Sequence, residues 1–459
     1  MSRLVIIGGS DAGISAALRA REFDAGSEVT VVVADRFPNY SICGLPFYLS
    51  GEVPDWRQLA HRTEEEITGK GIHLLLNHTA KTIDTANREV TVMNSDWQGN
   101  QLRYDRLILA TGAVPVRPTL PGIDLSGVYL LRTMEDSFAI NEHLRTHNLR
   151  SAVIVGGGYI GMEMADALTH RGLAVTVVEH GESLPKTVDQ SLGQLVSDEL
   201  RRHHIQVITS VRVEGIAKVG TQLSVIGSQG FQIAADLVLV AVGVQPQTEV
   251  AKSAGITLGL RDAIRITRAM ETNVPDIFAA GDCVETWHRL LNQPTYLPLG
   301  TTAHKQGRIA GENALGGHQY FAGTLGTQVV KVFETVVART GLRDDEARNA
   351  GFDPLTVEST NWDHKVYYPG AHPLCIRVTG DRQSGRLLGA QMVGHWHTEV
   401  AKRIDVFATA LFQGMLIDDL NHLDLSYTPP VSSPWDPIQT SAQAWVRAQE
   451  SSHDVVRTH

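Results

Sequence analysis

Cysteine is scarce in this chain of 459 residues, which has three, Cys43, Cys283 and Cys375. Their spacing fits neither a disulfide framework nor a set of metal ligands, so we expect no metal site, and such cysteine usage suits a reducing cytoplasm. No apolar run approaches the roughly 18 residues that a membrane-spanning helix needs. The apolar start at residues 4–7 is too short for a signal peptide. We therefore expect a cytoplasmic protein with no membrane partner.

Long runs of charge of one sign are also missing. The chain has 40 Lys and Arg against 50 Asp and Glu, a formal net charge of −10, and the charges are dispersed. Nucleic-acid binding needs a basic patch, so the sequence predicts no nucleic-acid partner. The length suits about three domains.

A glycine-rich turn follows the first apolar stretch. Residues 4–7 predict a buried parallel strand, residues 14–20 a helix and residues 29–33 a second strand. Backbone N–H groups in such a turn bind the pyrophosphate of a dinucleotide, and an acid after the second strand binds a ribose hydroxyl. Ser10 replaces the second glycine of G-x-G-x-x-G, so by itself the turn also fits a structure without a ligand. The predicted binding residues here are Gly8, Gly9, Ser10, Asp11, Ala12, Gly13, Asp35 and Arg36.

A second unit of the same kind contains the complete G-x-G-x-x-G at residues 156–161. A strand precedes it, and a helix and a strand ending at Glu179 follow it, which makes the signal strong. Two such units imply two dinucleotides. Glu179 would accept from a ribose 2′-hydroxyl and repel a 2′-phosphate, which favours NADH over NADPH, although His180 and Lys186 lie close enough to oppose this. The predicted binding residues are Gly156, Gly158, Tyr159, Ile160, Gly161, Glu163, Glu179 and Gly243.

Further turns follow predicted strands elsewhere in the chain. An acid after a strand and a glycine, as in Asp282, can bind a ribityl chain, although a helix N-cap is an equal alternative. His304, in a loop entering a helix, is interpreted as a packing or capping residue. The additional predicted cofactor-binding residues are Ala110, Thr111, Gly112, Gly281, Asp282 and Thr302.

Cys43 lies just before a helix start marked by Gly44 and Pro46. Exposed N–H groups and the positive end of a helix dipole favour a thiolate, which is the reactive form of cysteine. The alternative for a lone cysteine is a buried and inert side chain. The two nucleotide units favour the reactive interpretation.

The last third of the chain carries no nucleotide motif. We predict strands at residues 329–333 and 374–378 and a helix across 400–411. The segment from Tyr427 to Pro437 contains four prolines around Trp435, and proline fixes the backbone. Such a rigid segment is suited to binding a partner subunit at small entropic cost.

The order of these motifs resembles the flavoprotein pyridine nucleotide-disulfide oxidoreductases. Many members carry a second redox cysteine at the position of Tyr48. The lone Cys43, with the sequence around Tyr427, is similar to the single-cysteine branch of coenzyme A-disulfide reductases, coenzyme A-persulfide reductases and NADH oxidases or peroxidases. The resemblance implies an α/β fold with two Rossmann-like domains and a C-terminal α+β dimerisation domain. The implied boundaries are 1–115 with 245–322 for FAD, 116–244 for NAD(P)H, 323–447 for dimerisation and 448–459 for a polar tail.

The resemblance also implies cofactors and catalytic residues. FAD and NADH or NADPH are the expected cofactors, with Cys43 as the redox-active residue. Tyr427 is expected to reach the partner's Cys43 in a homodimer with shared active sites, and Tyr367 or Tyr368 matches a second tyrosine there. The alternative is that these tyrosines are packing residues of the interface.

Three positions depart from the branch. Oxidases and peroxidases carry a histidine where this chain has Asp11, and a carboxylate near a thiolate repels it. The coenzyme A branch carries asparagine and arginine where this chain has Ile42 and Glu22.

From the motifs together we predict an NAD(P)H-dependent reductase of a disulfide or persulfide of low molecular weight. The alternatives are an NADH oxidase or peroxidase that cycles Cys43 through a sulfenic acid, reduction of a metalloid, or an electron-transfer flavoprotein that serves a protein acceptor.

Overall fold

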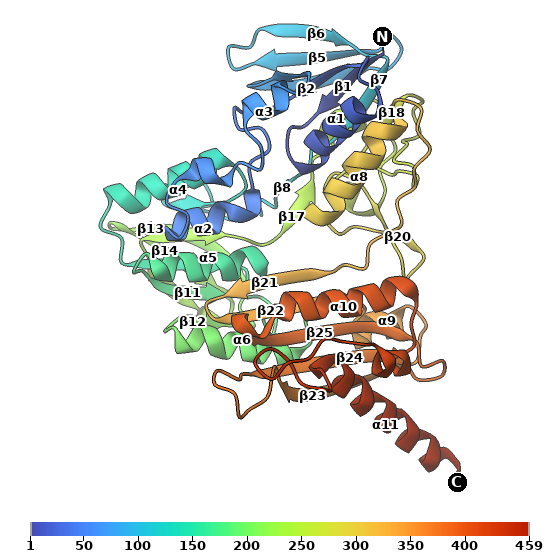
Figure 1. Cartoon of the computed structure of the whole chain (residues 1–459). Coiled ribbons are helices and arrows are strands. Elements are labelled where there is room, and N and C mark those ends of the chain that lie inside the picture. Colours follow the sequence, from blue (N-terminus) through green and yellow to red (C-terminus); the bar gives the residue numbers. More distant parts are fainter. Residues whose placement is uncertain (1, 458–459) are drawn as a thin grey trace.

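The first sheet gathers strands from two distant parts of the chain. In the computed structural model, which describes residues 2–457 (Figure 1), this sheet is parallel and has the order β18-β7-β1-β2-β3. Its strands are β1 (Arg3–Ile7), β2 (Glu28–Val32), β3 (Ile72–Leu75), β7 (Arg106–Leu109) and β18 (Ile277–Ala279). Because β18 follows the second nucleotide unit in sequence, the first domain is assembled from two separate segments.

Two helices of the first domain pack against each other at very short distance. They are α1 (Asp11–Phe23) and α8 (Gly300–Asn313). A Cβ at Gly307 would lie 2.2 Å from the carbonyl oxygen of Ala12, and one at Gly311 would lie 2.2 Å from that of Ala16. Only glycine permits this approach of the two backbones. The close contact brings the N-terminal turns of both helices to one edge of the sheet.

The second sheet repeats this parallel arrangement. Its order is β12-β11-β10-β16-β9, with α5 (Tyr159–His170) and α6 (Gln190–Arg202) in the same domain. The core strands are rich in valine and almost fully buried, as expected for a parallel sheet. The strands are β9 (Val128–Tyr129), β10 (Ser151–Val155), β11 (Ala174–Val178), β12 (Gln206–Ile208) and β16 (Leu237–Val240).

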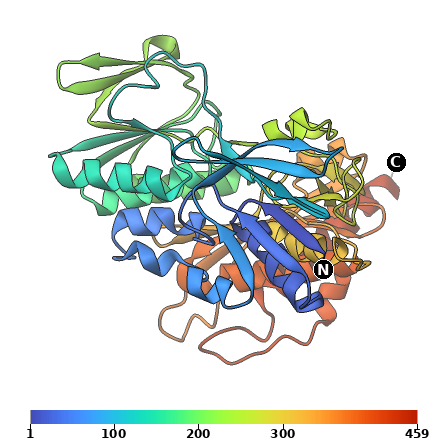
Figure 2. The ribbon, with the colours of Figure 1, turned by 90° about the horizontal axis from the view of Figure 1, so that it is seen from above.

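The third sheet is antiparallel, with the order β21-β22-β25-β24-β23. Its strands are β21 (Gln328–Val332), β22 (Thr335–Gly341), β23 (Pro354–Trp362), β24 (Pro373–Asp381) and β25 (Leu387–His395). The helix α10 (Val400–Gln413) packs on β25 and β22. The predicted strands and helix of this region are present, and the α/β fold with a C-terminal α+β domain is confirmed. The loops around β23–β24 and after α10 project from one side of the molecule (Figure 2).

The C-terminal helix α11 (Pro437–Arg457) is longer than the sequence suggested, since we predicted a polar tail after residue 447. The stretch from Ile438 to Arg457 contains no glycine or proline to end a helix, and Trp445 anchors it by complete burial and a 2.7 Å hydrogen bond to Leu355 O. No helix within residues 2–457 combines the length and the apolar character needed to cross a membrane.

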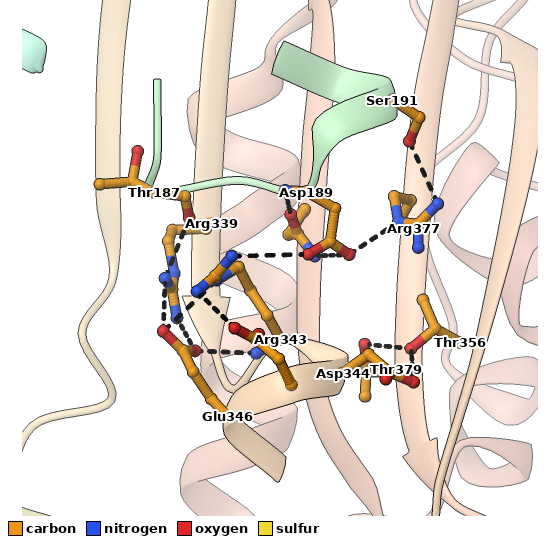
Figure 3. Close-up of polar contacts among 12 residues, drawn as sticks. Thr187, Asp189, Ser191, Arg339, Arg343, Asp344, Glu346, Thr356, Arg377 and Thr379 are labelled. Atoms are coloured by element: carbon orange, nitrogen blue, oxygen red, sulfur yellow. Dashed lines mark hydrogen bonds and ion pairs between the residues drawn. The ribbon is translucent and has the colours of Figure 1, made fainter. Parts of the chain in front are cut away.

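The second domain is joined to the third by a network of charges (Figure 3). Asp189, just before α6, accepts from Arg377 at 2.9 Å and from Gln391 at 2.8 Å, and Arg343 lies 3.8 Å away. The backbone N–H of Asp189 donates in return to Gln391 Oε1 at 2.6 Å. These contacts fix the orientation of α6 on the antiparallel sheet.

Candidate active site

The predicted FAD-binding residues meet at the carboxyl edge of the first sheet. A Cβ at Gly8, where φ is +114°, would lie 2.0 Å from Ala110 O, and one at Gly13 would lie 1.8 Å from Gly8 O. A Cβ at Gly281, where φ is +88°, would lie 2.8 Å from the Cβ of Ala12. These contacts bring the three turns 8–13, 110–112 and 281–282 together.

The N-terminus of α1 is open to an anion. Its N-cap, Ser10, makes no side-chain capping bond, so the N–H groups of the first turn remain available. Asp35 stands half-buried after β2 and accepts from the Phe37 N–H at 2.8 Å. Burial raises the pKa of Asp35, and that N–H partly opposes the rise. Arg36 is exposed and lies over the Phe37 ring, whereas Thr302 is buried in the first turn of α8. An uncapped helix end with an acid beside it fits the phosphates and ribose of FAD.

The second glycine turn has the same geometry. Gly156 has φ +110°, and a Cβ at Gly161 would lie 2.0 Å from Gly156 O. The N-cap of α5, Gly158, has open space above it and no side chain to cap the helix. Gly243, at φ +119°, is likewise open, and Ile160 is 38% exposed at the start of α5. This turn therefore fits the pyrophosphate of a pyridine nucleotide.

Glu179 is held tightly beneath this turn. It accepts from Gly157 N–H at 2.9 Å and Gly181 N–H at 2.6 Å, and Lys186 Nζ lies 2.7 Å away. Burial alone would raise the pKa of Glu179, but the bonds from Lys186 and the two N–H groups outweigh it and lower the pKa. Of the two cations that the sequence places close to Glu179, Lys186 is the one that pairs with it.

Cys43 occupies a short 3-10 turn, η1 (Ile42–Gly44), directly before α2 (Leu45–Ser50). The segment is anchored to the FAD turn because the Asn39 N–H donates to Gly9 O at 2.8 Å. The side chain of Cys43 is exposed, whereas Cys283 and Cys375 are buried. Tyr48, at the place of a second redox cysteine, accepts from Asn141 Nδ2 at 3.0 Å and has a structural role.

We predicted that the helix start would favour the Cys43 thiolate and so lower its pKa. This prediction was wrong, because the surrounding protein groups raise the pKa of Cys43. Although one side of the thiol is open to solvent, crowding by protein raises its pKa, and the carboxylates of Glu163, Asp11 and Asp282 raise it further. Arg132 opposes them. The helix behind Cys43 is a single short one, so its dipole is weak compared with three acids.

Two acids near the thiol have altered acidity themselves. Burial raises the pKa of Glu163, on the first turns of α5, to about 7, with a smaller contribution from Asp166. Burial also raises the pKa of Asp282, while Arg132, 3.4 Å away, opposes the rise. The sequence did not identify Arg132, because it lies in a linker without a recognisable motif.

A histidine reaches this region from an unexpected element. His304, on α8, has its Nδ1 2.8 Å from the Ser15 hydroxyl and its Nε2 3.5 Å from Asp11. The His61 ring lies edge-on with its centroid 6.4 Å from that of His304. The sequence interpretation of His304 as a packing residue missed this arrangement, since only the contact of α8 with α1 brings residues 15 and 304 together.

The three predicted tyrosines lie in the projecting loops of the third domain. Tyr367, Tyr368 and Tyr427 are 75%, 43% and 44% exposed. Partial desolvation and then the neighbouring Tyr427 raise the pKa of Tyr367, so these two lie side by side. Among residues 2–457, no interaction joins any of the three to Cys43 of the same chain.

A buried arginine organises these loops. Arg403, 5% exposed on α10, donates to Asp363 O at 2.9 Å and lies 3.3 Å from the Asp436 carboxylate. Its partners belong to the two loops that hold the tyrosines. The loops are therefore fixed to the body of the domain although their aromatic tips are exposed.

Comparison with known proteins covers almost the whole chain. Residues 2–307 match the family model described as pyridine nucleotide-disulphide oxidoreductase, and residues 327–437 match the dimerisation domain of that family. The NAD(P)H sulfur oxidoreductase (CoA-dependent) of Pyrococcus abyssi is 34% identical over 96% of this chain and 97% of that protein. The coenzyme A disulfide reductase of Staphylococcus haemolyticus is 32% identical over 95% and 97%. The structure of an NAD-dependent persulfide reductase from A. fulgidus has 36% identity and a TM-score of 0.94, covering 98% of this chain and 84% of that one.

Proposed function

Because the chain belongs to the pyridine nucleotide-disulphide oxidoreductase family, we propose that it reduces a disulfide or persulfide of low molecular weight through Cys43. The observation that carries this proposal is one exposed thiol beside an uncapped nucleotide-binding turn, with the second cysteine position filled by the hydrogen-bonded Tyr48. Bound FAD and a reduced nicotinamide would supply the two electrons for the reaction.

The sulfur chemistry needs only one protein thiol. The Cys43 thiolate attacks one sulfur of the substrate, forms a mixed disulfide and breaks the substrate S–S bond. The other sulfur leaves as a thiolate and takes up a proton. Two-electron reduction of the mixed disulfide would then restore the Cys43 thiolate and release the second half of the substrate as a thiol. With a persulfide, the released sulfur is hydrosulfide.

We propose that the protein works as a homodimer with shared active sites. The projecting loops expose large apolar side chains, including Trp362, Val366 and Trp435, and the turn before α10 exposes Trp396. Water does not favour such a surface. Such a face suits a second copy of the chain, and Tyr427 would then reach the partner's Cys43. We also propose NADH as the preferred donor, since Glu179 occupies the position that binds a ribose hydroxyl.

One observation favours the oxidase or peroxidase alternative. Asp11 replaces the histidine of that branch. However, His304 lies 3.5 Å from Asp11, so an imidazole is still present in the same region. An imidazole there would assist a Cys43 sulfenic acid as well as a leaving thiolate. Hydrogen peroxide and oxygen are therefore among the electron acceptors to be tested.

The test is a comparison of electron acceptors. The FAD-loaded protein is assayed with NADH or NADPH against coenzyme A disulfide, coenzyme A persulfide, glutathione disulfide, hydrogen peroxide, oxygen and an artificial dye. We expect a disulfide or persulfide to give the highest kcat/KM, and Cys43→Ser to lose that activity while retaining dye reduction. Cys375→Ser is the matched control and should keep both. Retention of disulfide reduction in Cys43→Ser would contradict the proposal, and turnover with the dye alone would favour an electron-transfer role.

A further inference from the structure

An arginine-lined cavity shares none of its lining residues with the candidate active site. Its volume is about 270 Å³, and it lies between the first domain and the third. The first domain contributes Arg268, Arg289 and the ring of Trp287, and the third contributes Arg386 and the C-terminal end of α10.

The charge of this cavity is unbalanced. None of its lining residues is acidic, and among the side chains of residues 2–451 no carboxylate oxygen lies within 4.0 Å of the three guanidinium groups. The acid whose pKa Arg386 lowers is Asp381, but its carboxylate already accepts from Ser384 and from the Asp353 N–H. Three cations without a direct ion-pair partner stand out in a chain of net charge −10, because like charges brought together favour the binding of an anion.

The arginines are partly positioned in advance. Arg289 donates to Phe412 O at 2.8 Å and to Ala322 O at 3.1 Å, and its guanidinium lies 3.9 Å from the Phe412 ring centroid. Arg268 uses Nε alone, at 2.8 Å from Phe321 O, and its guanidinium is 5.8 Å from the Trp287 ring. In the described part of the chain the Arg386 side chain makes no hydrogen bond. Donors of Arg268 and Arg386 are thus left for a ligand.

We propose that this cavity binds a phosphate group, either as inorganic phosphate or as the end of a phosphate monoester. Guanidinium groups match the oxygens of phosphate in paired, charge-assisted hydrogen bonds. A dianion offsets three cations better than a single carboxylate does. The cavity is larger than phosphate itself, and the Trp287 ring offers a surface for an attached organic group.

This cavity is distinct from the tyrosine loops of the third domain. The tyrosine loops attach to α10 at Arg403, whereas the cavity lies at Phe412 near the other end of that helix. At 1.5 Å per residue, about 14 Å of helix separates the two positions. A bound phosphate would hold the first domain against the third, so its binding should stabilise the protein.

The test is calorimetric titration of the FAD-loaded protein in phosphate-free buffer, with saturating NAD⁺ to fill the pyridine nucleotide site. Inorganic phosphate and AMP are titrated separately. We expect one site per chain, and Arg386→Gln to weaken binding at least tenfold and abolish the phosphate-dependent rise in Tm. Arg386→Lys keeps the charge without the paired donors and should be intermediate. Tighter binding of AMP would identify a monoester as the ligand, and equal or weaker binding would identify free phosphate.

Arg201→Gln, on the exposed face of α6, is the matched control for the loss of one positive charge. It should bind phosphate like the unaltered protein. The proposal is overturned if phosphate produces neither heat nor a Tm shift, if Arg201→Gln weakens binding as much as Arg386→Gln, or if chloride competes with phosphate at equal concentration. Unchanged disulfide reduction by Arg386→Gln verifies that this variant is folded.

Discussion

His304 Nε2, on α8, lies 3.5 Å from the carboxylate of Asp11, on α1, although almost 300 residues separate the two along the chain. The pair exists because glycines in α8 let that helix touch the backbone of α1. Asp11 is also one of the carboxylates that raise the pKa of Cys43. The same residue therefore connects the histidine with the acidity of the thiol.

The first prediction concerns this carboxylate. Asp11→Asn removes a negative charge that raises the Cys43 pKa, so the pKa should fall and the thiolate fraction at neutral pH should rise. We expect alkylation of Cys43 by iodoacetamide at pH 7 to become about threefold faster. Ser15→Ala, which also removes a contact of His304 but no charge, is the control and should alkylate at the original rate. An unchanged pH profile in Asp11→Asn would show that Asp11 does not set the thiol pKa.

The second prediction concerns Glu163, whose pKa burial raises from 4.5 to about 7. A carboxyl with a raised folded-state pKa stabilises the fold below its unfolded pKa, and this contribution is lost as the pH rises through 7. Glu163→Gln should therefore be more stable than the unaltered protein at pH 8, by up to about 3 kcal/mol, and equally stable near pH 4.5. Thermal unfolding across this range measures the difference, with the exposed Glu142→Gln as control. A difference independent of pH would contradict the raised pKa.

The sequence was most informative where a backbone conformation demands a residue type. Gly8, Gly13, Gly156 and Gly161 each sit where a Cβ would strike a carbonyl oxygen, so the glycine spacing, together with the strands and helices predicted around it, indicated both turns. The lone Cys43 and the resemblance of its surroundings identified the family correctly. Both signals are local in the chain.

Contacts between distant segments were not predictable in the same way. Arg132 reaches Asp282 from a linker, and His304 reaches Asp11 across two helices, with no spacing rule that links these positions. The Cys43 pKa shows the same limit, because a helix start favours the thiolate but the acids gathered by the fold outweigh it. The electrostatics of the site therefore depend on tertiary structure.

The third prediction concerns nucleotide choice. Lys186 Nζ lies 2.7 Å from Glu179 and is the cation able to receive a 2′-phosphate. We expect kcat/KM to favour NADH by about tenfold, equivalent to about 1.4 kcal/mol. Lys186→Ala should widen this ratio by weakening NADPH, and Glu179→Gln should narrow it by removing the repulsion. A preference for NADPH in the unaltered protein would show that Lys186 outweighs the acid.

The fourth prediction concerns the contact between the second and third domains. Asp189→Asn removes a partly buried charge from Arg377 and Arg343 and should lower the free energy of unfolding by about 1–3 kcal/mol. Asp198→Asn is the matched control on α6, the helix that Asp189 precedes, where an exposed pair with Arg201 should contribute less than about 1 kcal/mol. Urea unfolding followed by circular dichroism compares the two. Equal effects would mean that the network of Figure 3 adds nothing beyond surface pairing.

The last prediction concerns sharing of the active site between subunits. Within one chain, no hydrogen bond or ion pair joins Tyr427 to Cys43. The Tyr427 side chain is 44% exposed, and its loop is anchored through Arg403. A fixed, exposed aromatic loop is suited to a partner surface, because little entropy is lost when it binds. Cys43→Ser and Tyr427→Phe homodimers should each be nearly inactive in disulfide reduction.

Mixing these two variants under conditions of subunit exchange distinguishes the arrangements. In a shared dimer, each heterodimer contains one site with both substitutions and one site with neither, so activity should return towards half of the unaltered value per heterodimer. If each chain instead completes its own site, every site in the mixture carries one defect and no activity returns. Native mass spectrometry measures the heterodimer fraction, which separates absence of exchange from absence of sharing. A monomer in solution would exclude a site shared between subunits altogether.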